Sequence, residues 1–591
     1  MQQIRVNVIR GFAATAMLVG PLAAQGQNCP VGKPGLLPLK YIGGPTVSAI
    51  TACDLMNRLY KYADDSMMGR QVGTPYHLKA VAYIESEVRR LGLKPGGPNG
   101  SFYQDFPIWN SSLDLASSLK VGEMSFSIGN KFLVIQGEST KSYTNVAVVF
   151  GGSPADTMTS LDSASVAGKL VVTMPGARLS PEVMQSASYK AYRSAIAGAA
   201  GVLQMQGDSL STPLVKNFTG AGETMSPPAT GPATRAPILL VTTPVLEAIF
   251  DGPVSVLKKG QVGKSVTTDV RYGRTLASPG RNVVAILEGS DPKLKGQYIA
   301  IGGHSDHIGF GAMTVPREHD SLRIFNAVGR PAGAEGGRTT PITAEEWTKV
   351  NADIAELRKV YPPRLDSISN GADDDGTGSV SVLEIAEAFA KGSVKPKRSI
   401  IFVWHAGEEM GMWGSGYFMD NPTIPRDSIV AQLNIDMVGR GAATDVTGQA
   451  KAPEGKREGE ALHGGEHYVQ LVGSRRLSTE LGDLVEKVNT DKKHGFVFDY
   501  NIDADGHQQN IYCRSDHWSY GKWGVPVVFF TTGGHADYHQ VTDEAQYIQY
   551  GHMAAVDNLI FDIAVAAANL DHRLVVDHAK PNPAPAASCK Q

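Results

Sequence analysis

Two adjacent glutamates near the middle of the chain are the residues that most clearly point to chemistry. Glu408 and Glu409 come shortly after the apolar run 398–403, which is typical of a buried parallel strand. In an open α/β sheet the carboxyl ends of such strands face the ligand crevice. Two carboxylates are tolerable there when they bind a metal or a cation, or transfer protons. A solvated acidic turn is the alternative interpretation.

Four other segments place potential metal ligands where a strand ends or the chain turns. These are His304 after residues 299–303, the consecutive Asp373, Asp374 and Asp375, Asp436 within the apolar run 429–437, and His539 after the run 525–530. Three consecutive carboxylates repel one another unless a cation offsets them. A buried aspartate such as Asp436 is costly without a partner, so we expect a ligand role. Asp306 is placed to orient His304 by accepting its other ring N–H.

The ligand types indicate zinc or a neighbouring divalent metal, because they are imidazoles and carboxylates without thiolates. Five ligand positions exceed the three protein ligands that one catalytic zinc ion uses. They fit two metal ions that share a bridging carboxylate and lie roughly 3.5–4 Å apart.

Taken in order, these motifs resemble the di-zinc aminopeptidase and glutamate carboxypeptidase family of metallopeptidases, over about 280–310 and 366–570. The resemblance implies a complete set of roles: one zinc on His304, Asp374 and Asp436, the other on Asp374, Glu409 and His539, with Glu408 as general base and Tyr538 as a hydrogen-bond donor to the oxyanion. The choice of Asp374 among three aspartates rests on the pattern Gly-x-x-Asp-x-Gly-x-Gly alone. Members of that family often have a cis peptide bond after the bridging aspartate.

The resemblance also implies an α/β fold, in which a mixed and mostly parallel sheet lies between helices. Short strand-like segments between turns predict a separate β-rich unit, similar to a protease-associated domain. The expected divisions are a helical lead-in at 25–139 that joins the catalytic domain, the β-rich insert at 140–265, the catalytic domain at 266–575 and a Pro/Ala-rich tail at 576–591. Within the lead-in we expect two helices between Ala52 and Leu93.

Two insertions interrupt the expected catalytic domain, at 308–368 and 442–466. The first is unusually long for the family, contains a helical stretch at 344–360, and carries six arginines: Arg317, Arg323, Arg330, Arg338, Arg358 and Arg364. Arginines that face the cleft would bind a substrate carboxylate bidentately. A solvated surface excursion is the alternative.

The N-terminus predicts export. Residues 1–24 combine Arg5 and Arg10 with an apolar stretch that ends in small residues, a signal-peptide pattern with cleavage expected after Ala24. This apolar stretch is too short to span a bilayer. We therefore expect a secreted or periplasmic protein that has no membrane contact after cleavage; an uncleaved membrane anchor is the alternative.

Composition and cysteine content fit this expectation. The chain of 591 residues is 42% hydrophobic and 19% charged, which indicates a globular protein of two or three domains. A net charge of −3 from well-mixed residues argues against nucleic-acid binding. Four cysteines permit disulfides in an exported chain. Cys29–Cys53 is the local pairing, and a bond from Cys589 that ties the termini together is the alternative.

The predicted function is a hydrolase that removes N-terminal residues from peptides, with two zinc ions per chain. An aminopeptidase needs an acidic or carbonyl-rich pocket for the substrate ammonium group, whereas a carboxypeptidase needs Arg or Lys for the carboxylate. The residues around the metals do not decide between them, so carboxypeptidase and dipeptidase activities stay open. Less favoured alternatives are a glutaminyl-cyclase-like enzyme and a non-catalytic binding protein on the same scaffold. The sequence predicts no oligomeric state.

Overall fold

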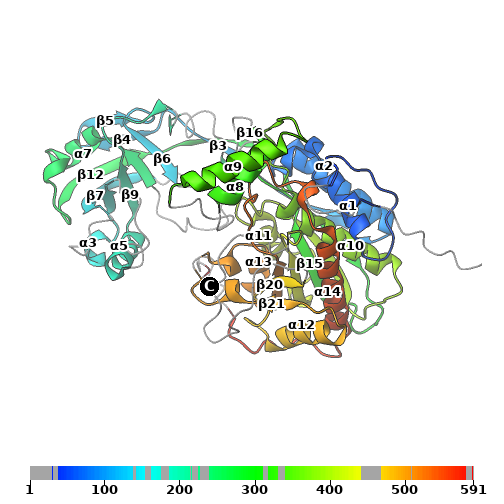
Figure 1. Ribbon diagram of the computed structural model, residues 1–591. Coiled ribbons are helices and arrows are strands. Elements are labelled where there is room, and N and C mark those ends of the chain that lie inside the picture. The colour runs from blue at the N-terminus through cyan, green and yellow to red at the C-terminus, as the bar shows by residue number, and fades with distance from the viewer. Residues whose placement is uncertain are drawn as a thin grey trace, which may run out of the picture.

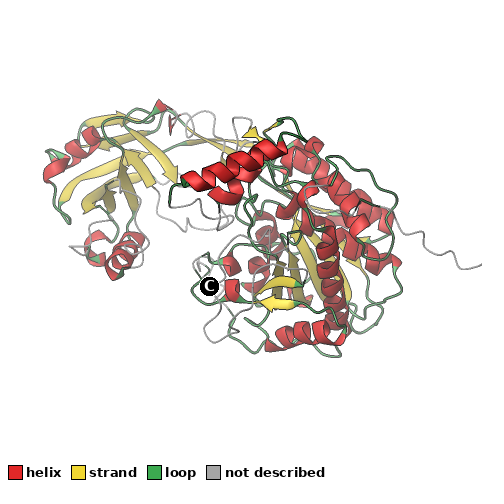
Figure 2. Cartoon of the chain, in the orientation of Figure 1, coloured by secondary structure: helices red, strands yellow, loops and turns green. Residues whose placement is uncertain are grey.

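The computed structural model describes residues 29–30, 37–136, 142–153, 161–174, 186–212, 214–215, 224–226, 238–310, 317–330, 340–440, 467–507, 509–580, 589 and 591. A mixed sheet with helices on both faces forms one part of the molecule, and a second, β-rich unit lies to its left in Figure 1 (Figures 1 and 2). The predicted signal peptide and the insertion 442–466 lie outside the described residues.

The main sheet has nine strands in the order β1-β14-β18-β15-β19-β22-β20-β21, with β2 also paired to β14. Their bounds are β1 Lys94–Pro95, β2 Tyr103–Phe106, β14 Gly280–Leu287, β15 Tyr298–His304, β18 Ser399–His405, β19 Ile429–Ile435, β20 Tyr468–Val472, β21 Val497–Asp499 and β22 Val527–Thr531. The central strands β18, β15, β19 and β22 are parallel neighbours. Antiparallel pairing of β14 and β20 on either side means that the expected mostly parallel sheet is parallel mainly at its centre.

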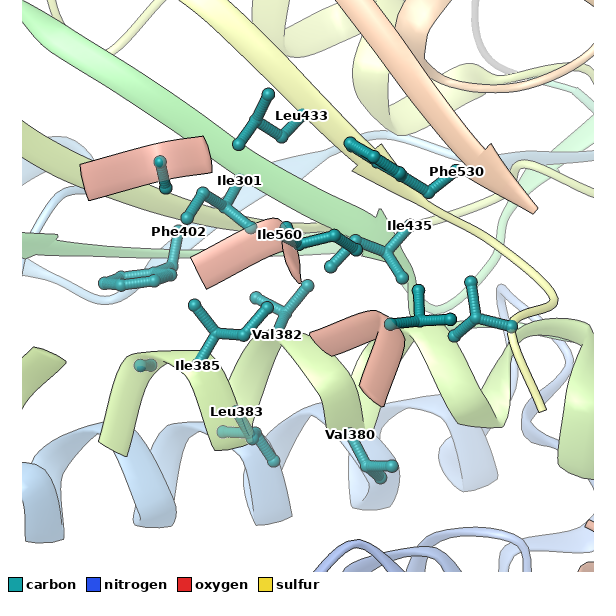
Figure 3. Packing of buried hydrophobic residues seen from close by; sticks show 14 of the residues in the cluster. Ile301, Val380, Val382, Leu383, Ile385, Phe402, Leu433, Ile435, Phe530 and Ile560 are labelled. Carbon is teal, nitrogen blue, oxygen red and sulfur yellow. The ribbon is translucent and has the colours of Figure 1, made fainter. Parts of the chain in front are cut away.

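Helices cover both faces of the main sheet, as predicted. Successive strand residues point to opposite sides, and here the residues on both sides are apolar and need cover. Ile299 and Ile301 of β15 belong to one apolar cluster and Ala300 to the other. The first cluster includes α1 Ala52–Tyr62, α2 Pro75–Leu91, α10 Gly378–Lys391, α12 Thr479–Asp491 and α14 Tyr550–Asn569. The second includes α11 Trp413–Asp420 and α13 His517–Gly521. Figure 3 shows α10 with Val382 and Ile385 directed toward the sheet.

Helix α14 is a core helix. Its length and apolar composition would suffice to cross a membrane, but most of its apolar stretch is buried in the protein. It packs against α1, α10 and α12, and this burial accounts for its apolar character. Helices α1 and α2 confirm the two helices expected in the lead-in.

The second sheet begins earlier in the chain than predicted. Its eight strands have the order β5-β4-β12-β7-β8-β9-β11-β6. Their bounds are β4 Ser118–Val121, β5 Met124–Ser127, β6 Phe132–Gln136, β7 Tyr143–Gly152, β8 Leu170–Thr173, β9 Gly201–Met205, β11 Ile238–Val241 and β12 Val262–Asp269. The first three belong to the segment expected in the lead-in; β4 joins this sheet by pairing with β12, and β6 by pairing with β11.

This β-rich unit has an apolar core of its own. It also contains α3 Ser163–Val166, α5 Ala187–Ala197 and α7 Thr243–Phe250. A small three-stranded sheet has the order β10 Thr224–Ser226, β3 Trp109–Leu113 and β13 Tyr272–Leu276. In the sequence, β3 precedes the β-rich unit, β13 follows it, and β10 lies within it.

The long first insertion folds as two packed helices, α8 His319–Gly329 and α9 Ala344–Leu357, which lie side by side in Figure 1. The rings of Phe325 and Trp347 join them with centroids 5.7 Å apart. Strands β16 Arg317–Glu318 and β17 Leu365–Asp366 pair at the base of the insertion. The helix predicted at 344–360 is therefore confirmed.

Two disulfides link segments at the ends of the chain to its interior. Cys29 pairs with Cys53, which confirms the local pairing, and Cys513 pairs with Cys589. The second bond brings the end of the C-terminal tail beside α13.

Candidate metal centre

The ends of four parallel strands bring potential metal ligands together at one edge of the main sheet. β15 ends at His304, and Asp436 directly follows its neighbour β19. Glu408 and Glu409 come after β18, on the other side of β15. His539 lies in the loop that follows β22. These side chains meet because the carboxyl ends of parallel strands share an edge.

Asp374 lies between two histidines. Its Oδ1 is 3.1 Å from Nε2 of His304, and its Oδ2 is 3.0 Å from Nε2 of His539. His304 Nε2 is also 3.7 Å from Oδ1 of Asp436, and His539 Nε2 is 2.9 Å from Oε2 of Glu409. The two oxygens of one carboxylate thus face two separate ligand sets, as a bridging ligand requires.

The carboxylates of the neighbouring aspartates are largely used by backbone N–H groups, although Asp375 also places a potential ligand atom within 4.8 Å of His304 and Asp436. The carboxylate of Asp375 accepts hydrogen bonds from three backbone N–H groups, those of His304, Gly378 and Met437. That of Asp373 accepts one from the Gly439 N–H, and its other oxygen lies 3.1 Å from Nε2 of His535. Geometry therefore favours Asp374 as the bridging residue. The Asp374–Asp375 peptide bond is cis, as in many members of the family that the sequence resembles.

The turn that carries Asp374 is supported by the N-terminal lead-in. Gly371 has a φ of 54°, and a Cβ there would lie 2.4 Å from Cγ of His307, so only glycine fits without a clash. The buried Arg70 donates hydrogen bonds to the carbonyl oxygens of Asn370 and Gly371, at 2.6 and 2.8 Å. The lead-in has no group among the ligands, but it fixes the backbone that presents one.

Asp306 acts on the site differently from the prediction. The Nδ1 of His304 is 3.0 Å from the backbone carbonyl oxygen of Asp306 and 3.6 Å from its carboxylate Oδ1. That oxygen instead accepts hydrogen bonds from the N–H groups of Gly407 and Glu408, at 2.7 and 3.2 Å. The carbonyl therefore orients the histidine, while the carboxylate holds the backbone of the predicted general base.

Glu408 lies beside the first ligand set, with its Oε2 4.0 Å from Nε2 of His304. Burial raises the pKa of Glu408 well above its ordinary value. Tyr538 stacks on the ring of His539, with centroids 3.8 Å apart and planes 15° apart. Burial raises the pKa of Tyr538, and the nearby charges of Asp374 and Glu409 add to the shift, so its hydroxyl stays protonated.

His307 is a site residue that the sequence prediction missed. Its Nδ1 is 2.7 Å from Oε1 of Glu409 and 3.7 Å from Oδ2 of Asp374, and its ring packs edge-on to that of His539. These four residues place one potential ligand atom each within 4.8 Å of one another. The only sequence signal was its position three residues after His304. Asp543 was also missed: its carboxylate accepts hydrogen bonds from the N–H groups of Asp373 and Asp374.

The charge balance of the cluster fits bound cations. Burial raises the pKa of Asp436 to about 7. Burial lowers the pKa of His539, but the adjacent carboxylates of Asp374 and Glu409 outweigh this and raise the pKa to about 10. The protein thus keeps a proton on an imidazole where a metal ion would supply the charge.

The same conclusion follows from unpaired atoms. Asp374 Oδ2, Glu409 Oε1, His539 Nε2 and both ring nitrogens of His307 are buried without a well-formed hydrogen bond. Such atoms are costly unless a ligand satisfies them. Nitrogen and oxygen donors in these numbers suit zinc, so the residues present fit a pair of zinc ions.

A third group of ligand types, His319, Asp366 and Glu544, lies outside this centre. Arg364 lies among them, with its guanidinium 3.2 Å from Glu544 and 3.7 Å from Asp366. The arginine offsets the negative charges here, so this group forms an ion-pair network.

A cluster of imidazoles and carboxylates at the carboxyl ends of parallel strands is the type of donor set with which metallohydrolases bind metal ions. Residues 282–564, which include every ligand named above, match the model of peptidase family M28. This match confirms, for this part of the chain, the resemblance found in the sequence.

Curated relatives match parts of the chain. A leupeptin-inactivating enzyme from Streptomyces exfoliatus is 40% identical over 78 residues, which are 13% of this chain and 18% of that protein. Leucine aminopeptidase 1 from Aspergillus fumigatus is 27% identical over 196 residues, 31% of this chain and 43% of that protein. The chain thus spans less than half the length of these relatives.

Among solved structures, an aminopeptidase from Aneurinibacillus sp. strain AM-1 has a TM-score of 0.44 and 16% identity, covering 90% of this chain and 97% of that one. A zinc aminopeptidase from Bacillus subtilis has a TM-score of 0.43 and 14% identity, covering 88% and 95%.

Proposed function

We propose that this protein is an exported di-zinc aminopeptidase. The observation that supports it best is the position of Asp374, whose two carboxylate oxygens face His304 on one side and His539 on the other. His304, Asp374 and Asp436 would hold one zinc ion, and Asp374, Glu409 and His539 the other. Bound zinc ions supply Lewis acidity, which lowers the pKa of water and polarises a carbonyl group.

Glu408 is the proposed general base and acid. Its carboxylate accepts a proton from the attacking water and returns it to the leaving amine nitrogen, so that the peptide bond is exchanged for a carboxylate and an amine. The two N–H bonds to Asp306 hold the Glu408 backbone and direct its side chain into the centre. Tyr538, held protonated, is available to donate a hydrogen bond to the oxygen on which negative charge develops.

The arginines of the first insertion favour aminopeptidase over carboxypeptidase activity. Arg330 donates to two backbone carbonyls, Arg364 pairs with Glu544, and Arg358 pairs with Glu318. These three guanidinium groups are used within the protein, so they do not form the carboxylate-binding site that a carboxypeptidase needs; the side chains of Arg317 and Arg338 lie outside the described residues. The name of one curated relative, leucine aminopeptidase 1, points the same way.

Two alternatives are less consistent with the site. A glutaminyl-cyclase-like enzyme would need one metal ion, but here the groups for a second ion are all in place. A non-catalytic binding protein would lack the general base, and Glu408 is present beside His304. Export by a signal peptide at 1–24, and assignment of the β-rich unit as a protease-associated domain, are further parts of this proposal.

Hydrolysis of a matched substrate pair tests the proposal. An aminoacyl anilide with a free amine and an N-acetylated peptide with a free carboxylate would each be incubated with and without chelator and added zinc. We expect chelator-sensitive cleavage of the anilide alone. Cleavage of the blocked peptide alone would reassign the enzyme as a carboxypeptidase, and cleavage of neither by the metal-loaded protein would favour the binding-protein alternative.

A further inference from the structure

Helix α8 of the first insertion packs against the rest of the protein through a polar face. His319 and Asn326 are its two buried residues, and at about 100° per residue they share one side of the helix with Arg323 and Arg330, within about 60° of each other. The apolar Phe325 instead contacts Trp347 of α9. A buried polar face requires specific partners, and those partners identify what the helix does.

The polar face contacts the segment that follows β22 at three levels. His319 at the start of α8 is 3.3 Å from Glu544 and stacks on the ring of Tyr547. In the middle, the Nε of Arg323 is 3.2 Å from Oδ2 of Asp537. At the end, the Nη1 of Arg330 donates to the carbonyl oxygens of Ala536 and Tyr538, both at 2.9 Å.

The loop 535–543 is the part of the metal centre that most needs such support. It carries His539, whose side chain is 32% exposed, whereas those of His304 and Asp374 are 1% and 4% exposed. His539 also has a φ of 56°, in the left-handed region that residues other than glycine rarely adopt. A ligand on an exposed loop keeps its geometry only if other contacts fix the loop.

Asp537 connects the loop to the rest of the structure. Its carboxylate is 2% exposed and accepts hydrogen bonds from Arg440 at 2.9 Å and from Thr542 at 2.7 Å, in addition to the contact with Arg323. Arg330 donates hydrogen bonds to the carbonyl oxygens of Ala536 and Tyr538, which precede and follow Asp537. The backbone is therefore held on both sides of Asp537.

We propose that Arg323 of the inserted helix α8 and Arg330, which directly follows that helix, are positioning residues for the second metal site, which fix His539 and Tyr538 through the backbone of loop 535–543. The inference rests on the proposed dinuclear centre. It assigns a role to the insertion at 308–368, which lies between His304 and Asp374 in the sequence but contacts the much later loop that presents His539. Neither arginine contacts the substrate in this role.

Cobalt(II) titration of the metal-free full-length protein tests the proposal, followed by the visible absorption of the bound ion. We expect wild type to bind two equivalents. Arg330→Gln should bind the first with unchanged affinity and the second about tenfold more weakly, as is typical when groups behind a ligand are lost. Arg330→Lys, which keeps a donor, should lie between the two. Activity of Arg330→Gln should be low at limiting zinc and recover with excess zinc, because every ligand is still present.

Two comparisons separate positioning from general damage. Arg89→Gln removes the same side chain from an exposed position on α2 and should leave both affinities unchanged. The first metal site is an internal reference, since poor folding would weaken both sites together. Hydrogen exchange of the metal-free Arg330→Gln protein should be faster in a peptide covering 535–543 than in wild type, and equal in a peptide covering β15.

The outcomes are distinguishable. Second-site affinity and loop exchange equal to wild type in Arg330→Gln would overturn the positioning role while leaving the dinuclear centre intact. Equal weakening at both sites would also overturn it, in favour of a folding role for the insertion. If wild type binds no cobalt and has no peptidase activity, the proposed function fails and this inference fails with it.

Discussion

Glu408 and Glu409 are adjacent in the chain but face different partners. Glu409 Oε2 is 2.9 Å from His539 and its Oε1 is 2.7 Å from His307, whereas Glu408 approaches His304 on the other side of the centre. Burial raises the pKa of Glu408. The pKa of Glu409 is lowered, because the effect of His307 and His539 outweighs that of burial. Glu409 is therefore suited to bind a cation, whereas Glu408 holds a proton more readily.

Glu408→Gln should abolish most activity without releasing metal. The amide has nearly the same shape but cannot accept a proton from water, so we expect kcat to fall by about 10²- to 10⁴-fold. Metal content, measured by elemental analysis after gel filtration, should equal that of wild type. Near-normal turnover in the variant would remove Glu408 from the mechanism, and loss of metal would make it a ligand.

His307 should be needed for the second metal site. His307→Ala should lower the affinity for the second metal equivalent by about 10- to 100-fold, because the imidazole either binds the ion or orients Glu409. His307→Gln separates these roles, since its amide can donate to Glu409 but is a poor ligand. Partial recovery of affinity in the glutamine variant would indicate orientation, and no recovery would indicate direct binding. Wild-type affinity in His307→Ala would contradict both.

The cluster of candidate ligand residues could be predicted because each of them ends or follows an apolar strand or lies in a Gly-rich turn, which are local signals. His307 and Asp543 could not, since their roles depend on contacts with Glu409 and with the turn at Asp373. The role of Asp306 was misassigned for a related reason. Spacing placed it near His304 but did not show that its carboxylate would be used by the backbone after β18.

At the scale of elements, the centre depends on close contact between α10, β15 and β19. Gly378 begins α10, and a Cβ there would lie 2.2 Å from the carbonyl oxygen of Ile435 and 2.3 Å from Oδ1 of Asp375. Both atoms are rigidly held, because the carbonyl ends a buried strand and the carboxylate accepts three backbone N–H bonds. The helix can approach the sheet this closely only without a side chain at that position.

Gly378→Ala should therefore destabilise the fold and weaken metal binding together. Overpacking of this kind costs about 1–3 kcal/mol of unfolding free energy, and displacement of α10 would move the neighbouring Asp374. Urea unfolding and metal titration measure the two effects. Gly416→Ala is the matched control, since that glycine lies inside α11 with no atom within 4 Å of the added Cβ. It should be neutral or stabilising by up to about 1 kcal/mol.

Long apolar strands and the helices of the lead-in were predictable, whereas the start of the β-rich unit was not. Strands β4, β5 and β6 are four to five residues long. β4 joins the second sheet only by pairing with β12, where Val121 lies opposite Val266. The residues 118–136 contain no pattern that indicates pairing with β12, so the sequence assigned this segment to the lead-in.

At the scale of the whole molecule, two buried histidines link stability to pH. His77 and His517 are completely buried, and burial lowers their pKa values to about 4 and about 3. His77 lies 3.0 Å from the hydroxyl of Ser305, and the ring of His517 stacks on Phe529. Both pack against the main sheet as neutral rings, so the folded protein resists their protonation.

His517→Phe should make the protein more resistant to acid. Below pH 6.5 the unfolded wild type binds a proton at His517 that the folded form does not bind until about pH 3, so stability falls as pH falls through this window. At pH 5 this linkage lowers the unfolding free energy by about 2 kcal/mol, because each pH unit below the ordinary histidine pKa of 6.5 contributes about 1.36 kcal/mol and pH 5 lies about 1.5 units below it. The variant lacks it, and phenylalanine fits a position already stacked on Phe529.

The measurement is the unfolding free energy from urea titrations at pH 7.5 and pH 5, compared between wild type and variant. The stability difference between the proteins should change by about 2 kcal/mol in favour of His517→Phe at the lower pH. His572→Gln is a control of opposite sign, because hydrogen bonds to Asp571 and Glu480 raise the pKa of this exposed histidine and stabilise its protonated form. Removing it should leave the protein slightly less stable in acid than wild type. Parallel pH profiles for wild type and His517→Phe would show that the buried ring is already protonated at pH 5, and that the negative charge of the adjacent Asp516 outweighs the effect of burial.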